Sequence, residues 1–177
     1  ASVSLWAFSR IIFLEKSNIN YVILCLALSL GFLSKYAIIY FLISIIIALI
    51  IEKKILIKFK EHFSISSILF IFIGFFILIM QHLYWNFNNN FITAQHTLAN
   101  ANISGEGNSF KNLFKFFFEQ FLVFGPITLI VLFSILFKYK KLSLEEKILL
   151  FLTFIPLILV MIQAFVSRAH ANWAAIA

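Results

Sequence analysis

The stretch YVILCLALSLGFLSKYAIIYFLISIIIALII, residues 21–51, is apolar along almost its whole length, but the segment GFLSKY at residues 31–36 interrupts it with a glycine and a lysine. Glycine adopts backbone angles that other residues avoid. We therefore predict two short helices, residues 20–34 and 36–51, with Gly31 giving the freedom for the turn between them. Each helix of roughly 15 residues is about 22 Å long at 1.5 Å per residue, against about 30 Å of hydrocarbon in a bilayer.

The composition indicates a membrane protein. Hydrophobic residues make up 63% of the 177 residues and charged residues only 12%, whereas soluble domains carry about 25% charged residues. The mean hydropathy is +1.03. A single water-soluble core cannot hide this much apolar surface, so a bilayer is the natural solvent. We predict an all-α fold, a polytopic bundle of transmembrane helices with a short extracytoplasmic polar segment.

The charge distribution favours a membrane protein over a nucleic-acid-binding protein. The chain has 14 lysines and arginines against 7 glutamates and no aspartate, and its formal charge is +7. Many of the positive charges fall in two short segments between apolar stretches, residues 52–62 and 138–147, which we interpret as basic cytoplasmic loops. No nucleic-acid-binding motif accompanies them, so no nucleic acid is expected as a partner.

Counting crossings from these two loops gives a topology. Two spans separate the loops, so the Asn-rich segment 83–112 between those spans is expected outside the cytoplasm. Arg10 and Lys16 indicate that residues 10–20 are cytoplasmic, and an even number of crossings must join them to the first basic loop. Lys35 then lies near the outer leaflet. We predict one transmembrane domain over residues 1–177, with spans at about 20–34, 36–51, 64–82, 113–137 and 148–166.

The segment that leads into the fourth span has its own signals. In FKNLFKFFFE, residues 110–119, Lys111, Lys115 and Glu119 recur every four residues, which predicts a helix lying in the outer interface. Gly125-Pro126 then predicts a kink within the membrane.

Two cations on the predicted outer side are candidates for binding a lipid phosphate. Lys35 is a point charge that suits phosphate, and an ionisable residue in a membrane segment is a functional candidate. Arg168 follows the last span and can hold phosphate through two hydrogen bonds. The alternative for Lys35 is a lysine that extends to lipid headgroups, and the alternative for Arg168 is a helix-end anchor.

Aromatic and amide side chains on the same side are candidates for binding a sugar. Tyr84, Trp85 and Asn86 combine stacking faces with donors and acceptors that suit sugar hydroxyls, and His96 and His170 can serve the same purpose. The alternative for the tyrosine and the tryptophan is the aromatic belt found at membrane interfaces. The histidines lack the tight spacing of metal ligands, so neither a metal nor another cofactor is expected.

Four segments, taken in order, carry a resemblance to a known family. GFLSKYAIIYFL (31–42) resembles the G-L-x-L-S-K-Y hairpin of bacterial membrane glycosyltransferases of family 39. YWNFNNNFITAQH (84–96) resembles the WN-containing loop of that family. EQFLVFGPI (119–127) is similar to its Q-x-x-x-x-G-P helix start, and RAHANWAA (168–175) to the sequence that opens a later span. The family includes protein mannosyltransferases and the aminoarabinose transferases of lipid A.

The resemblance implies a GT-C fold and an enzyme in the bacterial inner membrane that crosses it several times. Such enzymes transfer a sugar from a polyprenyl-phosphate donor to an acceptor at the outer face. The partners are then membrane lipid, the lipid-linked donor, and a glycan, lipid or protein acceptor. The family's catalytic acidic residue lies in a first external loop that has no counterpart here. We therefore expect it upstream of Ala1, in a longer polytopic protein.

The competing hypothesis is a multi-pass transporter or lipid flippase without transferase activity. It would also need cations for lipid phosphate, and transporters often contain broken helices in inverted repeats. An acidic residue soon after the first span of the upstream sequence would favour the transferase, and a repeated broken span would favour the transporter.

Overall fold

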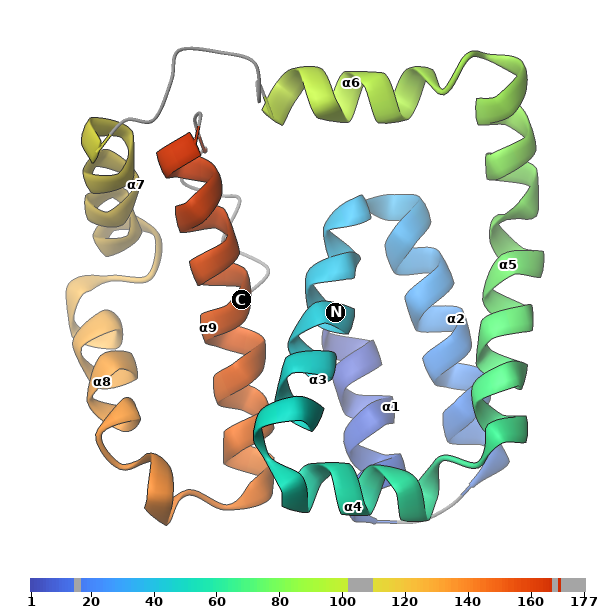
Figure 1. Cartoon of the computed structure of the whole chain (residues 1–177), viewed down its shortest axis with the longest axis horizontal. Helices are drawn as coiled ribbons and strands as arrows, with labels where there is room; N and C mark the ends of the chain where they lie inside the picture. The colour runs from blue at the N-terminus through green and yellow to red at the C-terminus, as the bar shows by residue number, and fades with distance from the viewer. Residues whose placement is uncertain (15–16, 102–109, 167–168, 170–177) are drawn as a thin grey trace.

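The computed structural model describes residues 1–14, 17–101, 110–166 and 169, and all regular structure in those ranges is helical (Figure 1). The all-α prediction is therefore confirmed. The elements are α1 (Ser2–Phe13), α2 (Asn18–Ser34), the short 3₁₀ helix η1 (Tyr36–Ile38), α3 (Ile39–Ile51), α4 (Lys53–His62), α5 (Ile65–Asn88), α6 (Ile92–Ala101), α7 (Phe110–Val123), α8 (Pro126–Leu136), η2 (Tyr139–Lys141) and α9 (Leu144–Val166).

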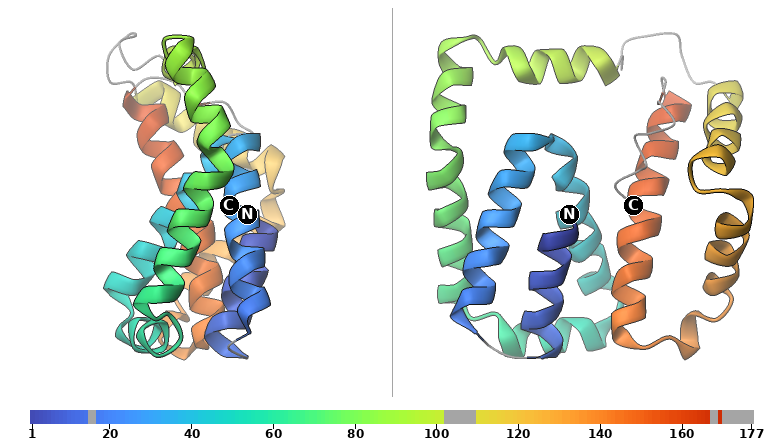
Figure 2. Two further views of the ribbon diagram at one scale, coloured as in Figure 1. Left: turned by 90° about the vertical axis from the view of Figure 1, so that its right-hand side faces the viewer. Right: turned by 180° about the vertical axis from the view of Figure 1, so that it is seen from behind.

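Most of the helices run side by side in roughly the same direction, and two short helices lie across them at the two ends (Figure 1). In Figures 1 and 2, α4 runs across one end of the molecule and α6 runs across the opposite end. η2 lies at the same end as α4, so the two lysine-rich segments share what we call the basic end. The other end, closed by α6, is called the pocket end. The orientation of these ends in a membrane stays a prediction.

The predicted break in the long apolar stretch is confirmed. Helix α2 ends at Ser34, Lys35 has extended backbone angles (φ −159°), and η1 begins at Tyr36. The prediction that Gly31 forms the turn is wrong, because Gly31 lies within α2. A Cβ atom at Gly31 would stand 3.0 Å from Cγ1 of Ile38. The glycine therefore permits η1 to pack closely on α2, and Lys35 makes the turn.

The first basic segment is a helix rather than the loop expected. In α4, Ile55 is buried and Phe59 is half-buried on the same face, whereas Lys53 and Lys54 are exposed. Apolar residues four apart meet on one side of a helix, so this spacing buries a face against the bundle. At the far end of α4, the backbone oxygen of His62 accepts a 2.6 Å hydrogen bond from the hydroxyl of Tyr21.

The main core lies between α1, α2, α3, α4 and α9. Phe8 of α1 contacts the rings of Phe41 and Phe63 at 6.4 and 5.9 Å between centroids. The buried residues of this main core are Ala7, Phe8, Ile11, Ile12, Tyr21, Leu24, Leu28, Ile38, Phe41, Ile45, Ala48, Ile55, Phe63, Ile148 and Phe151. A second cluster joins Phe116 of α7 to α9. This core packs the α2–α3 hairpin against α1, α4 and α9.

Helix α5 packs on one side only. A Cβ atom at Gly74 would stand 2.7 Å from Sγ of Cys25, so the glycine allows α5 to approach α2 closely. Only 6% of the residues in the most apolar part of α5 are buried, against 39% for α9. By length and composition, two helices in the described residues could cross a membrane, namely α5 and α9, or three if the bent pair α7–α8 counts as one span.

The predicted kink at Gly125-Pro126 is confirmed. The chain bends by 109° between α7 and α8. Gly125 has φ +81°, and Pro126 starts α8. Proline suits the first position of a helix, where no backbone N–H is needed. The stretch 113–137 is therefore two helices rather than one straight span. Within the polar segment 83–112, the described residues are mostly helical too, since α5 extends to Asn88 and α6 follows.

A buried ion pair closes the basic end. Nζ of Lys147 lies 2.5 Å from Oε2 of Glu52, with the two side chains 12% and 14% exposed. The hydroxyl of Tyr139 donates to the same carboxylate oxygen at 3.2 Å, and the ammonium lies 4.8 Å from the tyrosine ring centroid. The hydrogen bond from Lys147, helped by the charge of Lys147 and the hydroxyl of Tyr139, holds the pKa of Glu52 below its usual range. The pair joins the α3–α4 junction to the start of α9.

We predict that Glu52→Gln destabilises the folded protein by about 1–3 kcal/mol, because it leaves the largely buried Lys147 ammonium without its counter-charge. Thermal unfolding of the detergent-solubilised protein measures this, with the exposed Glu61→Gln as the matched control. Because folding lowers the carboxyl pKa, its contribution is present above the unfolded-state value of about 4.3 and is lost as the pH falls through the folded value. The stability gap between wild type and Glu52→Gln should therefore close on acidification, and a gap independent of pH contradicts the assignment.

We also predict that Gly31→Val lowers the unfolding temperature, because the added side chain overlaps Ile38. A second change, Ile38→Ala, should restore part of the loss in the Gly31→Val background, although it destabilises the wild type on its own. A double-mutant cycle on unfolding temperatures measures the coupling. Purely additive effects would show that the two residues do not press against each other.

Candidate functional site

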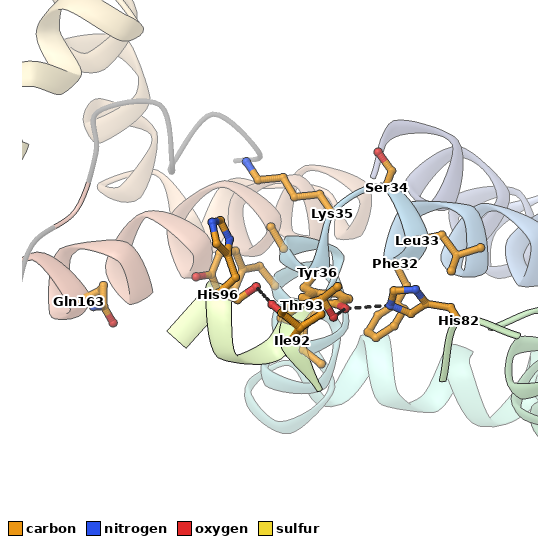
Figure 3. Close-up of a pocket in the computed structure, with 14 residues that line it drawn as sticks. Phe32, Leu33, Ser34, Lys35, Tyr36, His82, Ile92, Thr93, His96 and Gln163 are labelled. Carbon is orange, nitrogen blue, oxygen red and sulfur yellow. Dashed lines mark hydrogen bonds between the residues drawn. The ribbon is translucent and has the colours of Figure 1, made fainter. Parts of the chain in front are cut away.

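A pocket of about 790 Å³ lies at the pocket end, between the α2–η1 turn, the end of α5, α6 and the end of α9 (Figure 3). Its apolar lining comes from Phe32, Leu33, Ala37, Ile39, Tyr40 and Ile92. Its polar lining comes from Ser34, Lys35, Tyr36, His82, Thr93, His96, Thr97 and Gln163. The pocket therefore joins an apolar wall to several groups that can bind a polar ligand.

Lys35 lies on the rim of this pocket. Its side chain is exposed, and the extended backbone at this residue turns it outward from the end of α2. In Figure 3 the lysine reaches from the turn toward the side of the pocket where His96 of α6 lies. The described lining residues include no aspartate or glutamate, so no carboxylate among them neutralises the ammonium.

Beside the lysine, four side chains form a closed set of hydrogen bonds, which we call the polar quartet: Tyr36, His82, Asn86 and Thr93. The hydroxyl of Tyr36 lies 2.8 Å from Nε2 of His82 and 2.7 Å from Oγ1 of Thr93. The Asn86 amide lies 3.1 Å from the same Nε2, and the Thr93 hydroxyl donates to Oδ1 of Asn86. The quartet joins η1, α5 and α6 at one point.

The hydrogen bonds of the quartet constrain one another. Neutral histidine offers one lone pair on its unprotonated ring nitrogen, and both the Asn86 amide and the Tyr36 hydroxyl face Nε2 of His82. Because the Thr93 hydroxyl donates to Asn86, it can accept from Tyr36. Two arrangements fit these contacts. An unprotonated Nε2 accepts from one of the two donors that face it, whereas a protonated Nε2 donates to Tyr36, which then donates to Thr93 while the Asn86 amide donates to the His82 backbone oxygen.

Phe32 packs the quartet on its apolar side. Its ring centroid lies 4.8 Å from Tyr36, 5.6 Å from Phe75 and 6.3 Å from His82. Edge-to-face and tilted contacts at these distances stabilise aromatic pairs. The last turn of α2 thus packs against both Tyr36 and His82.

The structure brings together some of the candidate residues and separates others. Lys35 and His96 both line the pocket. Asn86 is buried at 4% exposure and belongs to the quartet. Tyr84 and Trp85 are 68% and 48% exposed and are not among the pocket-lining residues. Arg168 and His170 lie outside the described residues.

Several pocket residues were not predicted from the sequence, namely Tyr36, Thr93, Thr97 and Gln163. His82 and Asn86 are four apart on one helix, a spacing that indicates a shared face. Tyr36 directly follows Lys35 but carries no signal of its own. Thr93 and Gln163 reach the pocket only through the placement of α6 and α9, which no local pattern encodes. In the part of the chain that the structure describes, no three His, Cys, Asp or Glu residues group as a metal site would require.

Comparisons with known proteins agree with the sequence resemblance. The model of the family described as dolichyl-phosphate-mannose-protein mannosyltransferase matches residues 1–85. A lipid A galacturonosyltransferase, RgtD, from Rhizobium johnstonii is 27% identical over 158 residues. That alignment covers 86% of this chain and 32% of the relative, so the chain spans about a third of the length of the curated relative it matches. No solved structure matches.

The family match covers α1 to most of α5, the part of the chain that supplies Lys35, Tyr36 and His82. The similarity to the curated relative extends over most of the chain. With the all-helical fold and its apolar helices, these matches confirm the resemblance of this chain to membrane glycosyltransferases of the GT-C type.

Proposed function

We propose that the full-length protein transfers a sugar from a polyprenyl-phosphate donor to an acceptor at the outer face of the bacterial inner membrane. The observation that carries the proposal is the pocket at the end opposite the two lysine-rich segments, with Lys35 on its rim and no carboxylate among its described lining residues. The family whose model matches is named for an enzyme that uses dolichyl-phosphate-mannose, a donor of this chemical class.

The pocket lining suits both parts of such a donor. Phe32, Leu33 and Ile39 offer an apolar wall for the isoprenoid chain next to the phosphate. Lys35 lies beside that wall and can stabilise the negative charge that grows on the phosphate as the sugar leaves. His96, Thr97 and Gln163 offer donors and acceptors for sugar hydroxyls.

Three further roles complete the proposal. Arg168 supplies a second cation for the phosphate, and His170 a further sugar contact. Tyr84 and Trp85, exposed at the end of α5, offer stacking faces to a sugar that extends beyond the pocket.

The curated relative favours one class of acceptor. RgtD is named for the transfer of galacturonic acid to lipid A. Of the glycan, lipid and protein acceptors considered, we therefore propose a lipid acceptor for this protein.

We predict that Lys35→Ala in the full-length protein weakens binding of a polyprenyl phosphate about tenfold, the effect of losing roughly 1.4 kcal/mol of charge attraction. Lys35→Arg keeps the charge and should retain most of the affinity. Lys140→Ala, which removes an exposed lysine of η2 at the basic end, is the matched control. Titration of the purified protein in detergent with undecaprenyl phosphate measures all three.

Two outcomes would overturn parts of this proposal. Equal affinity of Lys35→Ala and wild type would show that the lysine does not bind the donor phosphate. Movement of the lipid-linked sugar across a vesicle bilayer, without any sugar transfer to an acceptor lipid, would favour the transporter or flippase instead.

We predict that His96→Ala raises the KM for the lipid-linked sugar severalfold while leaving the affinity for sugar-free polyprenyl phosphate unchanged. The reason is that His96 faces the pocket from α6 and would contact the sugar and not the phosphate. Steady-state transfer assays and the phosphate titration separate the two effects. A loss of phosphate affinity in this variant would contradict the assignment.

A further inference from the structure

Helix α6 crosses the pocket end without an apolar face to hold it. Of its residues Ile92–Leu98, only Thr93 and Ala94 are half-buried and the others are exposed. A helix that packs through apolar contacts buries residues at spacings of three and four. No such buried set exists in the described side chains of α6, so its position depends on something other than the core.

The position of α6 nevertheless matters to the pocket. Ile92, Thr93, His96 and Thr97 all line the cavity. Figure 1 shows α6 running across the end of the molecule above the α2–α3 hairpin, and Figure 3 shows its side chains facing the turn that carries Lys35. If α6 moved away, the pocket would lose one of its walls.

Thr93 attaches α6 to both neighbouring elements. Its hydroxyl donates to Oδ1 of Asn86 in α5 and lies 2.7 Å from the hydroxyl of Tyr36 in η1. Asn86 is buried and is itself held by a 3.0 Å hydrogen bond from its amide to the His82 backbone oxygen. A buried amide oxygen that lost its donor would be left unsatisfied, which is costly.

The corner between α5 and α6 has unusual backbone angles. Asn90 and Phe91 have φ of +53° and +55°, and they are the non-glycine residues with positive φ in the described ranges. Asparagine tolerates this region, but an aromatic residue there is uncommon. Such a backbone persists only where the surroundings fix it. The quartet spans this corner, from Asn86 before it to Thr93 after it.

We propose that Thr93 is a positioning residue, and that the polar quartet locks α6 in place as the wall of the pocket opposite the α2–η1 turn. Polar hydrogen bonds, rather than apolar burial, set the distance between Lys35 and His96. The consequence for the reaction rests on the proposed function, whereas the lock itself does not. When the hydrogen bonds of the quartet are broken, α6 leaves its position and the pocket opens.

Hydrogen–deuterium exchange of the full-length protein, without substrate, tests the lock. Thr93→Val keeps the shape of the side chain and removes the hydroxyl, so backbone amides of residues 92–101 should exchange about tenfold faster. Tyr36→Phe should act in the same direction. Thr93→Ser keeps the hydroxyl and should exchange like wild type.

Thr97→Val is the matched control for exchange, because the hydrogen bond that the Thr97 hydroxyl makes to a described residue stays within α6, to the backbone oxygen of Thr93 at 2.8 Å. Exchange of residues 92–101 in Thr93→Val at the wild-type rate, or equally fast exchange in Thr97→Val, would overturn the lock. Peptides from α1 and α3 should stay protected in all variants, which distinguishes a released α6 from a misfolded protein.

Transfer assays then test the consequence for the reaction. Thr93→Val should raise the KM for the lipid-linked sugar several times more than it lowers kcat, with Thr93→Ser restoring the wild-type value. A released α6 with an unchanged KM would overturn the positioning role while leaving the lock intact. A protein without transferase activity would refute the proposed function, and the exchange result would still stand.

Discussion

The close approach of η1 to α2 at Gly31 is the contact on which the rest of the structure depends. Because a Cβ atom at residue 31 would stand 3.0 Å from Ile38, glycine lets η1 pack on the last turn of α2 without displacing that side chain, and the chain reverses at the extended Lys35. That reversal places Lys35 at the rim of the pocket and Tyr36 directly beside it. Tyr36 in turn meets side chains from α5 and α6. The pocket is thus built outward from one tight helical hairpin.

The sequence predicted those features that the bilayer and the backbone impose locally. Apolar stretches in lipid must satisfy their own hydrogen bonds, so helices follow, and Gly125-Pro126 predicted the bend between α7 and α8. The role of Gly31 was misjudged, because glycine serves close packing as readily as turns. The Glu52–Lys147 pair joins residues 95 positions apart, and no local pattern encodes a contact of that kind.

The candidate site was also predicted only in part from the sequence, and helical geometry explains which residues were grouped wrongly. Successive residues on a helix point about 100° apart, so Tyr84, Trp85 and Asn86 cannot share one direction. Asn86 lies one turn after His82 and faces inward with it, whereas Tyr84 and Trp85 face outward. A composition argument that grouped all three as a sugar site could not separate them. Thr93 needed the three-dimensional placement of α6 to be found.

Two polar clusters hold helices together, the Glu52–Lys147 pair at the basic end and the polar quartet at the pocket end. Of these two, the pair contains a carboxylate and the quartet does not. At the basic end, a carboxylate neutralises Lys147 and fixes two helices together. At the pocket end, the quartet achieves a similar join with a phenol, an imidazole, an amide and a hydroxyl. A carboxylate in the quartet would lie near Lys35 and would compete with any anion for the ammonium. Because the quartet contains no carboxylate, it holds α6 at the pocket without neutralising Lys35, which stays able to attract an anionic ligand.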